Sequence, residues 1–354
     1  MHQTLEYRIG ALAQWGKVME LLSTADAWPG YESGLSQEEF DSLRQLIVGH
    51  VHYNGWFTEN NIRKALFAWS ELLTEASLRN WLRDYDLKPP GAMRKVGIIC
   101  AGNIPLVGLH DVLCVLLSGH QAVVKLASDD NRLLPALAQI LYRFDESAQS
   151  QIVFADGLMK GMDAMIATGS NNSSRYFEQY FGHLPHIIRK SRTSVAFLLG
   201  DETDEELKLL GTDIFSYFGL GCRNVSKMYV PRDFNLDRFF NAIYPWADIV
   251  NHNKYANNYD YNKAVWLLNS DQLLDNGFVL LKEDKALAAP TGSLYYEFYD
   301  DEAAVRSDLA SREKEIQCIV GRKDIAFGNA QCPTLSDYAD RIDTLEFLLG
   351  LNCA

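Results

Sequence analysis

Hydrophobic positions in residues 1–90 recur at helical spacing. Leu66, Trp69 and Leu73, for example, follow one another at intervals of three or four residues. This spacing is typical of helices that pack one face on a core. The Pro-Pro-Gly sequence at positions 89–91 interrupts the pattern, as expected at a structural boundary. We therefore predict an N-terminal helical segment over residues 1–90.

From residue 91 to residue 215 the pattern changes to short apolar runs separated by helical segments. Strands that alternate with helices predict an α/β fold with a doubly wound parallel sheet. Sheets of this kind bind ligands at the carboxyl ends of their strands. The predicted strands are 95–100, 122–126, 152–154, 164–167 and 194–199, and the predicted helices are 106–118, 131–142, 172–181 and 205–217.

A second α/β domain is predicted over residues 216–330, because further apolar runs alternate there with helical segments. A C-terminal tail, residues 331–354, follows this domain. In this tail, residues 335–340 continue into an amphipathic helix that is predicted to end near Leu349. The predicted strands of the second domain are 227–230, 264–268, 278–281, 294–298 and 316–320.

Composition narrows the class of protein. The chain has 354 residues and a net charge of −13, which argues against non-specific binding to nucleic acid. No apolar run is long enough to span a bilayer, and the first residues do not have the pattern of a signal peptide. The six cysteines form no CxxC pair, and His50 and His52 have no neighbouring acid or cysteine cluster that would suggest a metal site. We expect a protein without metal in a reducing cytoplasm.

One cysteine stands out by its surroundings. Cys222 follows a Gly-Leu-Gly sequence and precedes a strand-like run. Glycines let the backbone turn sharply and let a ligand approach closely, so the thiol could lie exposed and reactive at a loop tip. The alternative is a small thiol buried beside a turn.

Polar residues follow three of the predicted strands of the first domain. Asn103 could offer an amide to a ligand, or it could be a turn residue that satisfies its own backbone. Lys125 could reach a ligand hydroxyl or phosphate, or extend to the surface. The Thr-Gly-Ser sequence at 168–170 could present backbone N–H groups to a phosphate, or Ser170 could simply cap a helix. No GxGxxG sequence follows the first strand.

Taken in order, these signals resemble the aldehyde dehydrogenase superfamily, and within it the LuxC-like acyl-CoA or acyl-protein thioester reductases. The most specific part is the Gly-Leu-Gly-Cys-Arg-Asn-Val-Ser-Lys block at 219–227, and the tail at 328–338 is also similar. The resemblance covers roughly residues 90–350. It implies two α/β lobes, with a dinucleotide-binding domain at 91–215 and a catalytic cysteine domain at 216–330.

The resemblance also implies roles for individual residues. Cys222 would be the nucleophile, and Asn103 would donate to the oxyanion together with the backbone N–H of Cys222. Lys125 would bind the cofactor ribose. Gly169 and Ser170 would hold the cofactor diphosphate. A dimer or higher oligomer is also expected from the family.

Two positions differ from the hydrolytic members of the superfamily. Those enzymes carry a glutamate that activates water, whereas residues 187–194 contain no acid here. Without such a base an acyl-cysteine survives until a hydride arrives. The family acid that accepts bonds from the ribose hydroxyls is Ser128 here, which makes a 2′-phosphate tolerable. We therefore expect NADPH, with NADH as the alternative; the glutamate that often contacts the nicotinamide ribose is not located.

The expected activity is reduction of an acyl thioester, carried by CoA or a protein and with a fatty acyl chain, to the aldehyde. Two alternatives remain open: reduction of an acyl phosphate to a semialdehyde, and a binding protein that keeps the fold without turnover. The basic residues Arg189, Lys190 and Arg192 form a solvated strand edge or contact the phosphates of CoA or cofactor. The sequence does not give the acyl chain length.

Overall fold

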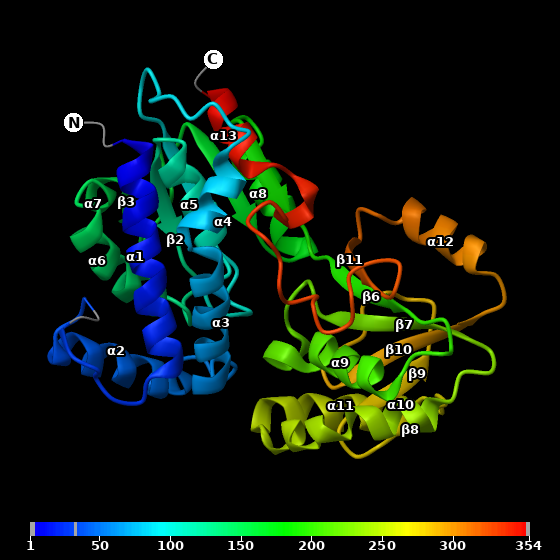
Figure 1. The fold of residues 1–354 in the computed structure, drawn as a ribbon. Helices are drawn as coiled ribbons and strands as arrows, with labels where there is room; N and C mark the ends of the chain where they lie inside the picture. Colours follow the sequence, from blue (N-terminus) through cyan, green and yellow to red (C-terminus); the bar gives the residue numbers. More distant parts are fainter. Residues whose placement is uncertain (1–3, 32–33, 352–354) are drawn as a thin grey trace. The chain divides into compact units, whose positions relative to one another are not determined.

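The chain folds into two compact units, which the computed structural model describes for residues 4–31 and 34–351. Unit 1 consists of Met1–Lys190 together with Thr334–Ala354, and unit 2 consists of Ser191–Pro333. Figure 1 shows the elements of both units, coloured along the sequence. Each unit contains its own sheet, so the α/β fold and the N-terminal helices predicted from the sequence are confirmed.

The boundary between the units follows residue 190, whereas the sequence analysis placed it after residue 215. Strand β6 (Thr193–Phe197) is the reason for this difference. It hydrogen-bonds to β7 (Val225–Pro231) and to β11 (Ile316–Val320), which are both strands of unit 2. Helix α9 (Asp204–Phe215) also lies in unit 2. The apolar run of β6 resembles those of the preceding strands, so the sequence alone does not reveal the change of sheet.

The sheet of unit 1 has the strand order β3-β2-β1-β4-β5, and all of its pairs are parallel. The three central strands end together, because Ile99 of β1 lies opposite both Lys125 of β2 and Ala167 of β4. Loops that follow these strands therefore meet at one edge of the sheet. The strands are β1 (Lys95–Ile99), β2 (Gln121–Lys125), β3 (Ile152–Phe154), β4 (Ala164–Thr168) and β5 (His186–Arg189).

Helices cover this sheet and form a large apolar core with it. In α5 every residue except His110 is buried, as the apolar pattern predicted. Helix α1 begins where the Thr4 hydroxyl accepts a hydrogen bond from the Tyr7 backbone N–H, and it runs alongside α3 in Figure 1. The other elements of unit 1 are α1 (Leu5–Thr24), α2 (Gln37–Gly49), η2 (His50–His52), α3 (Glu59–Leu72), α4 (Glu75–Leu82), α5 (Leu109–Leu117), α6 (Leu133–Phe144), α7 (Ala148–Gln151), α8 (Asn171–Phe181), η5 (Ala339–Arg341) and α13 (Thr344–Gly350).

The C-terminal segment returns to unit 1 after unit 2 is complete. The amphipathic helix predicted to end near Leu349 is confirmed as α13. Asp340 and Arg341, which precede it, have positive φ angles of 60° and 58°, so η5 and α13 are separate elements. Buried hydrogen bonds fasten the segment, including one of 2.8 Å from Trp81 Nε1 to the Tyr338 hydroxyl. The segment is therefore an integral part of unit 1.

The sheet of unit 2 has the order β11-β6-β7-β10-β9-β8, parallel except for the short edge strand β8. The strand predicted at 264–268 is wrong, because these residues form the last turns of α11. Trp266 is buried there while Leu267 and Leu268 are exposed, which is a helical pattern. The remaining elements are η3 (Ser216–Gly219), α10 (Leu236–Ile243), η4 (Tyr244–Asn251), α11 (Asn253–Leu268), β8 (Leu274–Asp275), β9 (Leu280–Glu283), β10 (Ser293–Tyr299) and α12 (Glu302–Ser311).

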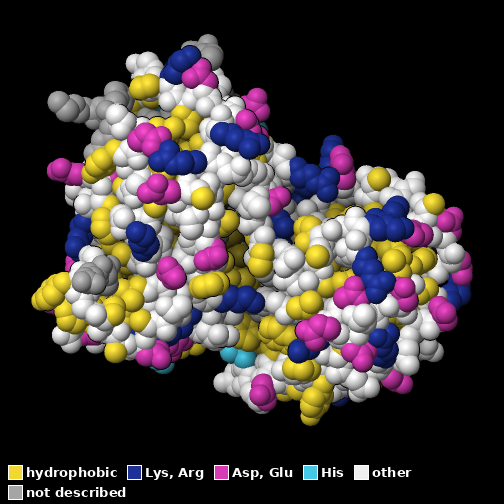
Figure 2. All heavy atoms as spheres, in the orientation of Figure 1, with side chains coloured by type: hydrophobic (Ala, Val, Ile, Leu, Met, Phe, Trp, Pro, Cys, Tyr) yellow, Lys and Arg dark blue, Asp and Glu magenta, His cyan; other side chains and the backbone are white. Residues whose placement is uncertain are grey.

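Charged side chains of both signs are interspersed over the face shown in Figure 2. Among the described residues, no helix combines the length and apolar character that crossing a membrane requires.

Candidate active site

Cys222 lies in a tight turn between η3 and β7 of unit 2, and its side chain is exposed. The interpretation of Cys222 as a buried thiol is therefore wrong. Three consecutive residues before the turn, Tyr217, Phe218 and Gly219, have positive φ angles of 53°, 59° and 76°. Such angles are unfavourable for side chains larger than glycine, so the surrounding structure must hold this segment in place.

A buried side chain, Asn224, holds the turn. It is only 2% exposed. Its Oδ1 accepts a hydrogen bond of 2.8 Å from the Gly221 backbone N–H, which closes the turn around Cys222. Its Nδ2 lies within hydrogen-bond distance of the carbonyl oxygens of Asp213 (3.0 Å), Ile214 (3.2 Å) and Ser216 (2.9 Å).

One amide therefore satisfies carbonyl groups at the end of α9 and also positions the cysteine turn. The sequence analysis missed the role of Asn224. The only sequence signal for it is an asparagine two residues after the cysteine, a position at which asparagine commonly satisfies local backbone.

The segment 328–332 is attached to the same turn. The Asp213 carboxylate accepts hydrogen bonds from the backbone N–H groups of Gly328 (2.7 Å) and Ala330 (2.9 Å). Arg223 donates from Nε to the Ala330 carbonyl oxygen. The backbone carbonyl of Cys222 accepts a hydrogen bond of 2.9 Å from the Ser194 hydroxyl. The turn is thus held from three directions within unit 2, while the thiol stays exposed.

Among the described cysteines, three differ from Cys222 in being buried. Cys100 and Cys114 are buried in unit 1, where burial raises the pKa of both thiols well above the usual range. Cys318 is buried in unit 2, and Cys332 is exposed. Cys353 lies outside the described residues. Within the described chain, Cys222 and Cys332 are therefore the two thiols open to reagents.

In unit 1, the predicted oxyanion donor Asn103 and the residues predicted to bind cofactor gather at the carboxyl edge of the sheet. Asn103 is half-buried in the bend after β1, and Lys125 is the last residue of β2. Gly169 and Ser170 follow β4 directly. Because β2, β1 and β4 are adjacent and in register, the structure brings these four residues to one edge.

Lys125 and Ser128 are open to a ligand at this edge. Lys125 is half-buried, and no described residue forms an ion pair or hydrogen bond with its ammonium group. Ser128 is exposed in the turn that follows β2. A hydroxyl at this position carries no negative charge that would repel a phosphate.

The start of α8 fits the diphosphate of a dinucleotide. Ser170 is the N-cap of this helix, because its hydroxyl accepts a hydrogen bond of 3.1 Å from the Ser173 backbone N–H. The capping interpretation is therefore confirmed. A Cβ on Gly169 would lie 2.9 Å from the ring of Phe177 and 3.0 Å from Cβ of Ser173, so only glycine lets β4 approach the helix this closely. Helix N-termini are favourable for phosphate groups, and together with Lys125 this donor set suits a nicotinamide dinucleotide.

The basic cluster has other partners. Arg189 is 4% exposed, and its guanidinium binds both oxygens of Asp111, at 2.6 and 2.9 Å. It is therefore neither a solvated strand edge nor open to a phosphate. Lys190 forms an exposed ion pair of 3.1 Å with Glu178. Arg192 belongs to unit 2 and donates to backbone carbonyl groups there.

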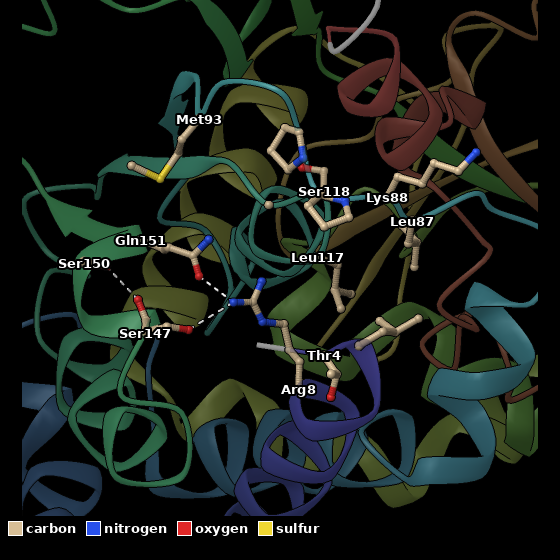
Figure 3. Close-up of a pocket in the computed structure, with 14 residues that line it drawn as sticks. Thr4, Arg8, Leu87, Lys88, Met93, Leu117, Ser118, Ser147, Ser150 and Gln151 are labelled. Carbon is tan, nitrogen blue, oxygen red and sulfur yellow. Dashed lines mark hydrogen bonds between the residues drawn. The ribbon is translucent and has the colours of Figure 1, made fainter. Parts of the chain in front are cut away.

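A pocket of about 200 Å³ in unit 1 does not coincide with these residues (Figure 3). It lies before β2 and β3, at the amino edge of the sheet, and is lined by Gly119 and Gln151 among others. The Arg8 guanidinium in this pocket binds Asp145 (3.2 Å) and Gln151 (2.6 Å). Because this pocket lies away from the carboxyl edge of the sheet and its arginine is already bound by protein groups, it is not our candidate site.

Comparisons with known proteins extend this description. A model of the acyl-CoA reductase (LuxC) family matches residues 28–237, more than half of the chain, including all of the candidate site residues. A search of curated proteins gave no match.

Several solved structures share the fold. An aldehyde dehydrogenase from Brucella melitensis is 13% identical with a TM-score of 0.63, covering 86% of this chain and 70% of that one. An NADP-dependent enzyme from E. coli is 15% identical with a TM-score of 0.61, covering 86% and 70%. Aldehyde dehydrogenase 21 from Physcomitrella patens, solved with succinate as reaction product, is 12% identical with a TM-score of 0.60, covering 88% and 74%.

Proposed function

Because the chain belongs to the acyl-CoA reductase (LuxC) family, a family of oxidoreductases with the aldehyde dehydrogenase fold, we propose that it reduces an acyl thioester to an aldehyde with NADPH. The observation that carries this proposal is the exposed thiol of Cys222, in a turn that Asn224 holds rigidly. Nucleophilic cysteines must be accessible, whereas structural ones are buried.

The first step is attack by the Cys222 thiolate on the carbonyl carbon of the thioester. A carbon–sulfur bond forms, the negative charge moves to the carbonyl oxygen, and the bond to the carrier sulfur breaks as the carrier leaves as a thiolate. Asn103 and the backbone N–H of Cys222 are the proposed donors to this oxyanion. Removing one such donor typically lowers the rate by about 10²–10³.

Lys125, Gly169 and Ser170 are the proposed cofactor-binding residues. When bound, NADPH supplies a hydride to the carbonyl carbon of the acyl group. Cys222 then leaves as a thiolate, the carbon–sulfur bond breaks, and the aldehyde is released. Ser128 supports NADPH over NADH, because it places no carboxylate next to the 2′-phosphate.

Loss of the acyl group to water is disfavoured by the residues at the end of β5. An acid in this region would act as a general base for water. Residues 187–194 contain none, and Arg189 in this stretch is neutralised by Asp111 rather than facing a ligand. This composition supports reduction and argues against hydrolysis to the free acid.

The test is a cofactor-oxidation assay with purified protein, NADPH and fatty acyl-CoA. We expect the wild-type protein and a Cys332→Ala control to oxidise NADPH, and Cys222→Ala to be inactive. Normal turnover by Cys222→Ala would refute the nucleophile assignment. Oxidation with an acyl phosphate but not with acyl-CoA would instead support semialdehyde formation. No oxidation with either substrate, with no faster alkylation of Cys222 than of Cys332, would support a binding protein.

A further inference from the structure

The loop after β2 occupies the place where dinucleotide-binding sheets read the adenosine ribose. The strand order 3-2-1-4-5 in unit 1 matches the order in doubly wound nucleotide-binding folds. In such folds an acid near the ribose accepts from the 2′-hydroxyl of NAD, and an arginine accommodates the 2′-phosphate of NADP. The residues of this loop therefore bear directly on the choice of cofactor.

Three segments contact one another around this loop. The Asn54 side chain donates a hydrogen bond of 3.3 Å to the Gly102 carbonyl oxygen, which joins the turn after η2 to the loop after β1. A Cβ on Gly102 would lie 2.5 Å from Cβ of Ala127, so the loops after β1 and β2 touch there. Side chains from the turn after η2 can therefore orient side chains of the loop after β2.

Arg132 is the basic side chain that this arrangement orients. It is exposed at the end of the loop, immediately before α6, and its guanidinium carbon lies 3.7 Å from the centre of the Tyr53 ring. Contact with an aromatic face fixes a guanidinium while its N–H groups remain available. No described residue forms an ion pair with Arg132. In a chain of net charge −13, an oriented arginine without a carboxylate partner is a feature that suits an anionic ligand.

The acids of the same loop are placed less favourably for the ribose. Asp130 is buried, 5% exposed. Asp129 is exposed, but its Oδ1 lies 3.2 Å from the position of a Cβ on Gly102, so this oxygen is directed at the loop after β1. Asp129 is nevertheless the rival determinant, because a carboxylate bound to the 2′-hydroxyl would favour NADH.

We propose that Arg132, oriented by Tyr53, binds the 2′-phosphate of NADPH and makes the enzyme prefer the phosphorylated cofactor. This proposal rests on the proposed function, since it assumes that the edge of the sheet holds a nicotinamide dinucleotide. Ser128 then tolerates the phosphate, and Arg132 supplies the attraction. The exposed position of Arg132 means that its replacement leaves the core of unit 1 unchanged.

Binding of two fragments tests the proposal without any turnover. Adenosine 2′,5′-bisphosphate carries the 2′-phosphate and 5′-AMP does not, and calorimetry measures the affinity of the full chain for each. We expect the wild-type protein to bind the bisphosphate about 10- to 100-fold more tightly. Arg132→Ala should remove this preference and leave the affinity for 5′-AMP unchanged. Tyr53→Leu should reduce the preference by a smaller factor, and rising salt should weaken it.

Arg83→Ala is the matched control, because Arg83 is an exposed arginine of unit 1 remote in sequence from the loop. It should keep the preference. Asp129→Asn should not lower the affinity for 5′-AMP. A preference that survives in Arg132→Ala, or a loss of both affinities in that variant, would overturn the proposal. Equal wild-type affinities for the two fragments would overturn it while leaving the reductase assignment intact, whereas binding of neither would overturn both.

Discussion

Each unit has a buried polar side chain that joins separate elements, and these two anchors differ in charge: Arg189 is ionic and Asn224 is neutral. In unit 1, Arg189 binds Asp111 of α5 and donates a hydrogen bond of 2.9 Å to the Thr344 hydroxyl. In unit 2, the neutral amide of Asn224 connects the end of α9 to the cysteine turn. The ionic anchor connects β5, α5 and the start of α13 in unit 1. The neutral anchor holds the turn that contains the candidate nucleophile Cys222.

The difference follows from what each place can accept. Removing one partner of a buried ion pair strongly destabilises the protein, because the other charge stays buried without compensation. An amide joins donors and acceptors without a net charge. The amide of Asn224 therefore closes the cysteine turn without adding a further charge to those of Arg223 and Asp213.

The largest effect is expected from breaking the ionic anchor. Asp111→Ala leaves the buried guanidinium of Arg189 without its carboxylate, so the free energy of unfolding should fall by about 3–5 kcal/mol. Urea titration followed by circular dichroism measures this change. Asp300→Ala is the control, because it removes the carboxylate of an exposed pair with Arg232, and its urea midpoint should equal that of the wild type. Equal urea midpoints for Asp111→Ala and Asp300→Ala would show that the buried pair stabilises the fold no more than the exposed pair does.

An intermediate effect is expected from breaking the neutral anchor. Asn224→Ala leaves the Gly221 N–H and several carbonyl groups without this partner, which should cost about 1–3 kcal/mol of stability. The turn should also loosen, so turnover should fall and the alkylation rate of Cys222 should change more than that of Cys332, whose segment is attached through Asp213 and Arg223 instead of Asn224. Mass spectrometry of iodoacetamide-treated protein separates the two sites. Unchanged alkylation and turnover would mean that Asn224 supports the fold but not the thiol.

The smallest effect concerns a buried polar residue, His50, which is fully buried and stacks on Phe57. Unlike the two anchors, its ring nitrogens form no hydrogen bond with any described residue. Burial lowers the pKa of His50, so below about pH 6.5 the unfolded chain binds the proton more readily than the folded one.

Acidification from pH 7 to pH 5 should therefore destabilise the wild type more than His50→Leu. The difference in slope is at most about 1.4 kcal/mol per pH unit, the limit for one proton. Burial also raises the pKa of Asp130 to about 7, which acts in the opposite direction but is present in both proteins. Urea midpoints across this pH range test the prediction, with the exposed His52→Leu as control. Parallel curves for wild type and His50→Leu would contradict it.

The sequence was sufficient for features that depend on local patterns. Strands β1 to β4 of unit 1, the buried character of α5 and the family all followed from apolar runs and short motifs, whereas β5 was not predicted. The apolar run at 264–268 misled the analysis, because five residues do not distinguish a strand from the end of a helix, and α11 has polar residues on most of its turns.

Features that depend on contacts between distant residues were beyond the sequence. Arg189 and Asp111 lie 78 positions apart, so their pairing could not be read from either neighbourhood. The same holds for Arg132 and Tyr53, whose contact links a loop to a turn in the N-terminal helical segment. Cys222 was recognised from its motif, but the exposure of Cys332 and the role of Asn224 needed coordinates.

The return of residues 334–354 to unit 1 fixes an order of events at the ribosome. Translation delivers β5 first, then the whole of unit 2, and only afterwards the helix that carries Thr344. Unit 1 therefore lacks its C-terminal segment while unit 2 is synthesised, and unit 2 can fold before unit 1 is complete. If translation ended after residue 333, the released chain would contain all of unit 2 but an incomplete unit 1, which would be a target for chaperones and proteases.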